Sequence, residues 1–98
     1  MIASFGDQAT ADLYHGIRSH RARRFPPDVV AAALRKLDML NSVRNINELR
    51  SPPGNRLETL RGDWRGFHSI RVNDQWRVVF RWAGGSPQDV RLTDYHRG

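Results

Sequence analysis

The stretch that decides the fold is residues 61–82, RGDWRGFHSIRVNDQWRVVFRW. Its second half alternates with a period of two, which is the side-chain period of an extended strand. One face of that strand is apolar, with Trp76, Val78, Phe80 and Trp82, and the other carries Arg77, Val79 and Arg81. The preceding run alternates in the same way, and Asn73-Asp74 supplies turn residues between the two runs. The stretch therefore predicts an antiparallel hairpin with an arginine-bearing face.

Upstream of the hairpin the apolar residues recur at helical spacing. Asp7 is a favoured N-cap residue, and the pattern after it predicts a helix over residues 7–16. Pro27 suits the first turn of a second helix, predicted over residues 27–42, and apolar side chains recur there at intervals of three and four. Between the helices, residues 18–24 hold four arginines and no acid. This segment is either a phosphate-binding loop or a solvated connector.

Shorter strands are predicted on both sides of the hairpin. Residues 1–5 and 56–60 are extended in pattern, and the second of these leads into the hairpin. Residues 83–87 predict a turn, and Val90 and Leu92 begin the alternation of a last strand that ends at residues 94–96. We therefore expect one α+β domain over residues 1–98, with two N-terminal helices packed on one face of a small, mostly antiparallel sheet. The opposite face would carry Arg71, Arg77, Arg81, Arg91 and Tyr95.

The charge of the chain indicates a polyanionic partner. Among 98 residues there are 16 basic and 10 acidic ones, a net charge of +6, and every basic residue except Lys36 is arginine. Arginine binds phosphate bidentately and stacks on bases, although a codon bias explains the ratio of arginine to lysine equally well. Without cysteine there is no disulfide or thiolate site, and no segment resembles a secretion signal or a membrane span. We expect a cytoplasmic protein that contacts no membrane.

The residues exclude several enzyme classes and leave phosphate chemistry open. The histidines do not have metal-ligand spacing, and no nucleotide-binding glycine motif or serine elbow is present, so we predict no cofactor and no metal. Cleaving RNA requires proton transfer at the 2'-hydroxyl and the leaving 5'-oxygen, and cations at the phosphorus centre. His96 is the best candidate for proton transfer, unless it lies in a frayed terminus, and Tyr95 beside it could stack on a base. Arg77 and Arg81 are either phosphate ligands or ordinary surface residues.

Several strings together resemble the HigB-type toxins of the RelE/ParE superfamily. They are Met1-Ile2-x-Ser4-Phe5, Pro52-Pro-Gly-Asn-Arg-Leu-Glu58, Leu60-x-Gly62-Asp63, Ser69-Ile-Arg-Val-Asn-Asp-Gln-Trp-Arg77 and Asp94-Tyr95-His96. The resemblance runs through almost the whole chain. It implies a RelE-like fold and a toxin of a type II toxin-antitoxin system. Such a toxin is a ribosome-dependent, metal-independent endoribonuclease that cleaves mRNA during translation. The implied partners are mRNA on the ribosome and a HigA-like helix-turn-helix antitoxin, with operator DNA bound only through that antitoxin.

The resemblance also implies which residues form the site. The catalytic positions would be Arg61, on the strand leading into the hairpin, with Arg77, Tyr95 and His96. His96 would act as general acid or base, Arg77 and Arg61 as phosphate and transition-state ligands, and Tyr95 as a stacking or positioning group. Glu58 is a second candidate for proton transfer. The predicted RNA contacts are Arg71, Asn73, Arg81 and Asp94.

Two other functions remain compatible with the sequence. A ParE-like inhibitor of gyrase, a topoisomerase, would share the scaffold and perform no chemistry. The ending Asp94-Tyr95-His96 favours the nuclease over this inhibitor. A plain basic RNA-binding module would bind RNA with a strong salt dependence and release no cleaved product.

Overall fold

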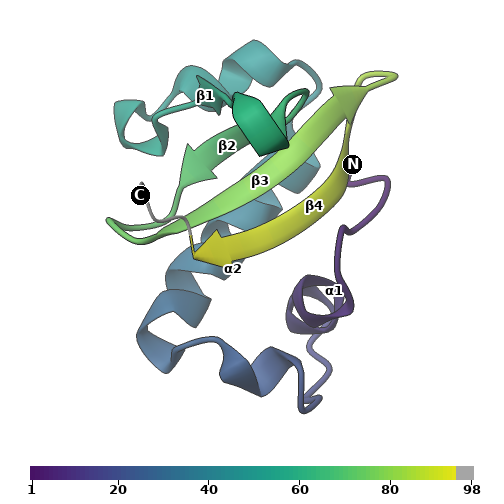
Figure 1. The fold of residues 1–98 in the computed structure, drawn as a ribbon, viewed down its shortest axis with the longest axis vertical. Coiled ribbons are helices and arrows are strands. Elements are labelled where there is room, and N and C mark those ends of the chain that lie inside the picture. The colour runs from purple at the N-terminus through teal and green to yellow at the C-terminus, as the bar shows by residue number, and fades with distance from the viewer. Residues whose placement is uncertain (95–98) are drawn as a thin grey trace.

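The computed structural model describes residues 1–94, and the predicted site residues Tyr95 and His96 lie outside that range. The two α-helices precede the strands in the sequence (Figure 1). The helices are α1 (Gln8–Tyr14) and α2 (Pro27–Ser42), and the strands are β1 (Glu58–Thr59), β2 (His68–Arg71), β3 (Trp76–Ala83) and β4 (Ser86–Asp94). Short 3₁₀ turns connect them: η1 (Ala22–Arg24), η2 (Ile46–Arg50), η3 (Pro53–Asn55) and η4 (Gly62–Trp64).

Both predicted helices are present, and their ends have local causes. Helix α1 starts after Asp7, whose carboxylate accepts a hydrogen bond from the backbone N–H of Thr10 at 2.8 Å. It is shorter than predicted, because Gly16 has a φ of 72° that a continuing helix does not allow. Helix α2 begins with Pro27 in its first turn and ends at Ser42, as the apolar spacing predicts.

The sheet has the order β1-β2-β3-β4, and each strand pairs antiparallel with its neighbour. The predicted hairpin is formed by β2 and β3, with Ile70 opposite Val78. Residues 1–5 form no strand of their own. Instead Phe5 makes an isolated parallel bridge to Val90 in β4, where the Gly6 N–H donates to the Val90 carbonyl at 2.8 Å. The sheet is therefore mostly antiparallel, as expected.

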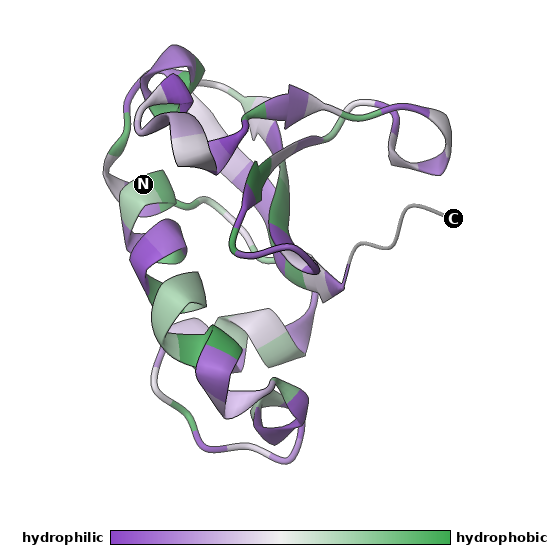
Figure 2. Cartoon of the chain, turned by 90° about the vertical axis from the view of Figure 1, so that its left-hand side faces the viewer, coloured by the Kyte–Doolittle hydropathy of each residue, from purple (hydrophilic) through white to green (hydrophobic). Residues whose placement is uncertain are grey.

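The helices cover one face of the sheet. Figure 1 shows α2 behind the strands, and in Figure 2 the helices and the strands form two separate layers. Alternation along the strands predicts that six apolar side chains face the helices: Ile70, Val72, Val78, Phe80, Val90 and Leu92. All of them except Val72 are buried in the core between the layers. Val72, the sixth, is partly buried and packs against the same core. Helix α2 contributes the buried residues Val29, Ala33, Leu37 and Leu40. Burial of these side chains is the main stabilisation of the fold.

A second, smaller apolar cluster lies on the other face of the sheet. Leu60, Phe67 and Val79 are buried there, and Trp64 packs against them. The alternation places Val79 among the arginines, but it does not predict that the loop between β1 and β2 folds over this residue. This face of the sheet consequently carries both a small apolar cluster and arginine side chains.

The structure corrects two predicted boundaries. The strand predicted over residues 56–60 contains only Glu58 and Thr59, and Arg61 lies beyond it as the residue that precedes η4. Arg61 is therefore on a loop and not on the strand leading into the hairpin, because the chain turns at Gly62, where φ is 64°. The turn after β3 is confined to Gly84 and Gly85, since Ser86 and Pro87 already belong to β4.

Candidate active site

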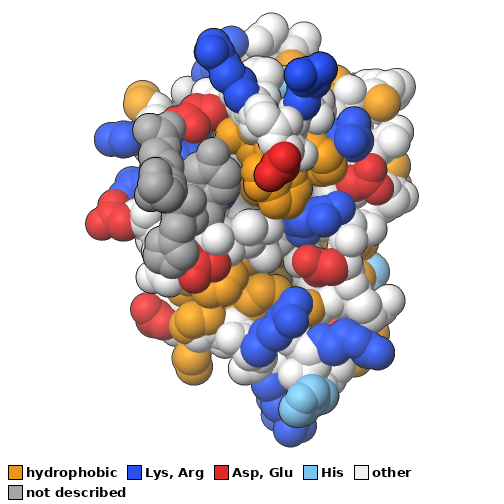
Figure 3. Space-filling model, viewed as in Figure 1, with side chains coloured by type: hydrophobic (Ala, Val, Ile, Leu, Met, Phe, Trp, Pro, Cys, Tyr) orange, Lys and Arg blue, Asp and Glu red, His pale blue; other side chains and the backbone are white. Residues whose placement is uncertain are grey.

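The face of the sheet opposite the helices carries arginine on three positions of β3 and β4 and on the end of β2. We define the arginine face as Arg71, Arg77, Arg81 and Arg91 together with Ser69. Arg71 lies directly opposite Arg77 in the β2–β3 pair. Figure 3 looks onto this side of the molecule and shows basic side chains spread over it, with hydrophobic and acidic ones between them. Like charges placed opposite each other repel, so an anion bound between them would be stabilised.

Arg77 is the most firmly held arginine of this face. Its side chain is only 12% exposed. Its Nε donates to the Ser69 hydroxyl at 2.7 Å, and its Nη2 donates to the Arg56 carbonyl at 2.7 Å. The same Nη2 lies 3.9 Å from a carboxylate oxygen of Glu58. The guanidinium is thus held in one orientation by groups from β2 and from the loop before β1. A donor fixed in this way is able to stabilise negative charge without reorganising.

Arg71 and Asn73 are fixed by the turn of the hairpin. Arg71 forms an ion pair with Asp74. The Asn73 side-chain oxygen accepts from the backbone N–H groups of Gln75, at 2.9 Å, and Trp76, at 2.8 Å. Asparagine commonly builds turns in this way. Asn73, a predicted RNA contact, therefore has a structural role in the turn that follows β2.

Arg81 and Arg91 lie over two rings of the second cluster, Trp64 and Phe67, which we call the aromatic platform. The guanidinium carbon of Arg81 is 4.3 Å from the ring centre of Phe67, and that of Arg91 is 5.5 Å from Trp64 and 5.6 Å from Phe67. These are cation–π distances. Arg81 also lies 3.5 Å from Asp89, which occupies a register shift between β3 and β4 and has a φ of 52°. Both guanidinium groups are therefore held close to aromatic rings.

A glycine makes room for Arg91. A side chain at residue 6 would collide with the Arg91 guanidinium, so Gly6 permits the first residues to pair with β4 while Arg91 lies across them. Within residues 1–94 the buried Nε of Arg91 has no hydrogen-bond partner. The first residues of the chain therefore lie close against the Arg91 side chain.

Glu58 and His68 lie on opposite faces of the sheet. Glu58 is opposite Ser69 and therefore next to Arg77 on the arginine face. His68 is opposite Phe80, with ring centres 5.8 Å apart, and its Nδ1 lies 3.2 Å from the Thr59 hydroxyl. Burial lowers the pKa of His68. The side chains thus place Glu58, and not His68, beside the arginines.

The remaining predicted site residues lie at the two ends of this region. Arg61 is exposed on the loop after β1. Asp94 ends β4 opposite Trp76, on the parity of the helix-facing residues, and accepts a hydrogen bond from Gln75 at 2.9 Å. Tyr95 and His96 follow Asp94 directly in the sequence. The structure therefore brings Glu58, Arg71 and Arg77 together, while the assignments of Tyr95 and His96 remain predictions from the sequence.

Two groups that contact Arg77 were not among the residues predicted from the sequence. Ser69 is fully buried and provides the acceptor for Nε, and the acceptor for Nη2 is a main-chain carbonyl. Alternation along β2 places Ser69 on the arginine face, which is a usable signal. The Arg56 carbonyl has no signal in the sequence, because 21 residues separate it from Arg77.

The two-layer arrangement defines the class of fold. It is similar to a chain of the YoeB-YefM complex from Staphylococcus aureus, with a TM-score of 0.59 over 99% of both chains and 14% identical residues. Two helices on a four-stranded antiparallel sheet make this a RelE-like α+β fold.

The sequence comparisons identify the family within that class. Residues 3–96 match the family described as "RelE-like toxin of type II toxin-antitoxin system HigB". Toxin HigB-1 of Vibrio cholerae is 39% identical over 97 residues, which cover 99% of each chain. Endoribonuclease HigB of Proteus vulgaris is 31% identical over 61 residues, 62% of this chain and 65% of that protein. The chain belongs to the HigB family of type II toxin-antitoxin toxins.

One further property concerns membranes. Across residues 1–94, neither helix combines the length and the apolar character needed to cross a bilayer.

Proposed function

We propose that this chain is a ribosome-dependent, metal-independent endoribonuclease that cleaves mRNA during translation and is neutralised by a cognate antitoxin. The name of the Proteus vulgaris relative supports the activity. The observation that carries the proposal is the fixation of Arg77, whose guanidinium is nearly buried and held at two hydrogen bonds on a face that carries three further arginines. An exposed surface arginine has no need of such support, whereas a ligand for a transition-state phosphate does.

The proposed roles follow from the chemistry of each side chain. Arg77 and Arg61 stabilise the negative charge that develops on the phosphate when the 2'-hydroxyl attacks it. His96 transfers one proton, because its unperturbed pKa of about 6.5 allows it to act as acid or base. Glu58, 3.9 Å from Arg77, is the candidate for the other proton transfer. Arg71, Asn73, Arg81 and Asp94 bind the RNA, and Tyr95 stacks on a base.

The aromatic platform supports single-stranded RNA as the substrate. Arginine guanidinium planes and aromatic rings both stack on unpaired bases. Arg81 and Arg91 are spread over Phe67 and Trp64, so they present flat cationic surfaces beside the phosphate ligand Arg77. We propose mRNA in a translating ribosome as that single strand, as the resemblance of the sequence to HigB toxins implies. Because translating ribosomes are in the cytoplasm, we propose that the protein acts there.

Mapping mRNA ends in cells that express the protein tests this proposal. We expect new 5' ends within open reading frames, and we expect them to disappear when translation is blocked or when His96→Ala replaces the wild type. Cuts that persist without translation would contradict ribosome dependence. An absence of cuts together with inhibited DNA supercoiling by gyrase would instead establish the non-enzymatic inhibitor. Metal independence predicts that cleavage continues when a chelator selective for transition metals is added at a magnesium concentration that keeps the ribosome intact.

The partner we propose is an antitoxin with a helix-turn-helix domain, through which the complex contacts operator DNA. An apolar groove of about 490 Å³ is the surface we assign to it. The groove is lined by Leu13, Gly16, Ile17, Arg18, Ala22, Arg23, Val30 and Leu34. It lies in the helix layer, whereas the arginine face is on the other side of the sheet.

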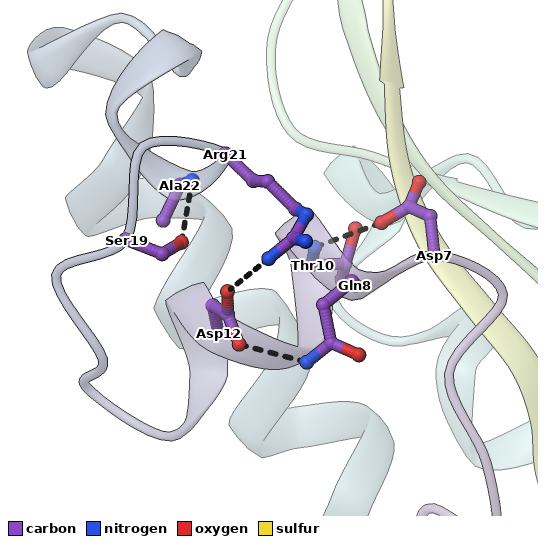
Figure 4. A network of polar contacts seen from close by, with 7 residues as sticks. All are labelled: Asp7, Gln8, Thr10, Asp12, Ser19, Arg21 and Ala22. Atoms are coloured by element: carbon purple, nitrogen blue, oxygen red, sulfur yellow. Dashed lines mark hydrogen bonds and ion pairs between the residues drawn. The ribbon is translucent and has the colours of Figure 1, made fainter.

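The wall of this groove is held in place by a polar network. Asp12 is buried in α1 and accepts from Gln8 at 2.8 Å, while Arg21 lies 4.0 Å from its other oxygen (Figure 4). Ser19 accepts from the backbone N–H of Ala22 at 3.1 Å. A hydrogen bond from the Ser19 side chain, the hydrogen bond from Gln8 and the positive charge of Arg21 lower the pKa of Asp12. The arginine-rich connector is therefore ordered against α1 and the groove is preformed.

The chemistry of the groove favours an acidic, apolar protein segment. Ile17 is 52% exposed on its rim, and within residues 1–94 no carboxylate lies within ion-pair distance of Arg18 or Arg23. An apolar floor with two uncompensated cations matches an antitoxin segment that carries apolar residues flanked by Asp or Glu. RNA would require stacking surfaces, and the residues that line the groove include no aromatic ring.

Arg23→Glu is expected to weaken antitoxin binding by at least about tenfold, because an attractive contact becomes a repulsive one. Arg50→Glu changes the charge by the same amount on η2, away from the groove, and serves as the control. Calorimetric titration of the cognate antitoxin into each toxin variant measures the effect. Equal affinity of the two variants would show that the antitoxin docks elsewhere. Loss of RNA binding by Arg23→Glu with unchanged antitoxin affinity would identify the groove as an RNA surface.

A further inference from the structure

One polar side chain in the loop before β1 is completely buried. Asn55 has no exposed surface, although its neighbours Pro53, Gly54 and Arg56 are exposed. Loops rarely bury polar groups, because each such group must find partners inside the protein. Asn55 belongs to the string Pro52–Glu58, to which the proposed reaction gives only one role, at Glu58. The burial of Asn55 therefore requires a separate explanation.

Every polar group of the Asn55 side chain has a partner. The amide nitrogen donates to the carbonyls of Leu49, at 3.1 Å, and Ser51, at 3.3 Å, and lies 3.1 Å from the sulfur of Met39. The amide oxygen accepts from the ammonium of Lys36. These contacts tie the loop to η2 on one side and to helix α2 on the other. A fully satisfied buried network of this kind holds its backbone in one position.

Lys36 is the single lysine among the 16 basic residues of the chain. It is partly buried, and this burial lowers its pKa, with the nearby Arg35 as a second cause. A compact ammonium with three donors reaches the Asn55 oxygen, whereas a planar guanidinium is wider and has a fixed fork of donors. In a chain that otherwise uses arginine, a lysine at this position indicates a requirement for the smaller group.

The loop ends in a carbonyl group that points at Arg77. Arg56 follows Asn55 directly and adopts a left-handed conformation, with φ 44° and ψ 57°. Non-glycine residues enter this region at a cost and stay there only when their surroundings hold them. The Arg56 carbonyl accepts from Nη2 of Arg77 at 2.7 Å, and Ser69 accepts from Nε at 2.7 Å. The conformation of Arg56 therefore determines one of the hydrogen bonds that orient the guanidinium within residues 1–94.

We propose that Asn55 is a positioning residue for the reaction: clamped by Lys36, Leu49 and Ser51, it fixes the Arg56 carbonyl, which with Ser69 holds Arg77 on the scissile phosphate. This inference rests on the proposed nuclease function, in which Arg77 is the phosphate ligand. A displacement of about 1 Å in a catalytic group can reduce a rate by about 10²-fold. The arginine side chain loses its conformational entropy when the protein folds, so it does not lose that entropy again when RNA binds.

Two measurements on the full chain test the clamp. The first is hydrogen exchange of the Arg77 Nε–H by NMR, which reports its hydrogen bond whether or not RNA is present. The second is steady-state mRNA cleavage on programmed ribosomes, which gives kcat and KM separately. For folded Asn55→Ala we expect Arg77 Nε–H exchange to accelerate at least about tenfold and kcat to fall about 10–100-fold with little change in KM. Asn47→Ala, an exposed asparagine on η2, is the matched control and should change neither quantity.

Variants at Arg56 separate its backbone from its side chain. Glycine adopts positive φ freely, so Arg56→Gly keeps the carbonyl in place and should leave the protection of Arg77 Nε–H intact. Valine resists this conformation, so Arg56→Val should lose protection as Asn55→Ala does. Lys36→Arg should also reduce the protection of the Arg77 Nε–H, but by less than Arg56→Val does. If Asn55→Ala does not fold, Arg56→Val and Lys36→Arg test the clamp in its place.

The outcomes distinguish this inference from the proposed function. Unchanged Arg77 exchange and unchanged kcat in folded Asn55→Ala and Arg56→Val would overturn the clamp. If the wild type cleaves no mRNA, the proposed nuclease function fails, and the exchange measurement alone then decides whether Asn55 orients Arg77. Faster exchange in Asn55→Ala with an unchanged kcat would show that the clamp is structural only and would overturn its positioning role.

Discussion

Replacing Arg77 with alanine is expected to abolish mRNA cleavage while the protein remains folded. The substitution removes the best-fixed cation of the arginine face, which donates to Ser69 and Arg56 and approaches Glu58. Removing one preorganised donor for transition-state charge costs about 10²–10³-fold in rate. A guanidinium that also binds the phosphate in the ground state loses affinity in addition, so cleavage and growth arrest should both fall below detection.

The fold should survive this substitution. Leaving the buried Ser69 hydroxyl without its donor costs about 1–3 kcal/mol, which is less than the roughly 5–15 kcal/mol stability of a typical domain. Circular dichroism and urea unfolding check this expectation. Arg77→Lys is the sharper variant, because an ammonium keeps the charge but cannot make both hydrogen bonds in the same geometry. It should retain RNA binding and lose most of kcat.

Arg35→Ala is the matched control for charge. It removes one positive charge from the exposed side of α2, in the layer opposite the arginine face. It should cleave mRNA at the wild-type rate. A folded Arg77→Ala that cleaves as fast as Arg35→Ala would contradict the assignment of Arg77. The measured quantity is the rate of mRNA cleavage in a purified translation reaction.

Replacing Phe80 with alanine is expected to have the largest effect on stability. Phe80 lies in β3, is fully buried, and contributes the largest completely buried side chain of the core. Truncating a buried phenylalanine costs about 3–5 kcal/mol, from the lost burial and from the cavity that remains. That is a third or more of the stability of many domains of this size. The urea midpoint should fall by more than about 1 M, or the variant should not fold at all.

Phe67→Ala is the matched control for this prediction. Phe67 is also buried, at 8% exposure, but it belongs to the small cluster under Arg81 and Arg91. A site near the surface can partly collapse around the truncated side chain, so the loss of stability should be smaller than at Phe80. RNA cleavage should fall instead, because the platform that orients the two arginines is gone. A larger loss of stability at Phe67 than at Phe80 would contradict the two-cluster description of the sheet.

Local patterns predicted most of the architecture. The alternation in residues 61–82 predicted the β2–β3 hairpin and the faces of its side chains, and the apolar spacing after Pro27 predicted α2. These features depend on neighbours within four residues, which the sequence displays directly. The same alternation placed Arg77 and Ser69 on one face and His68 on the other. The contents of the arginine face could therefore be predicted before any contact was known.

Contacts between distant residues could not be predicted in this way. The parallel pairing of residues 4–6 with β4, the folding of the loop over Val79, and the position of Arg61 on that loop depend on how separate segments meet. The sequence also predicted a proton-transfer group at His96 and a stacking group at Tyr95, two residues that follow the described part of the chain. For these two residues the sequence-based prediction stands by itself, and His96→Ala tests the first of them.

By itself, the sequence determined the helices, the hairpin, the side chains of each sheet face and the resemblance to HigB toxins, because periodicity and motif strings are local properties. Only the tertiary structure decided that Arg77 is a fixed cation, since its acceptors are the main chain of Arg56 and the hydroxyl of Ser69. It likewise decided that Asn55 and Lys36, 19 residues apart, meet inside the protein. The Arg56–Arg77 and Lys36–Asn55 contacts form only when the loop before β1 meets the hairpin and helix α2, and no run of neighbouring residues encodes them.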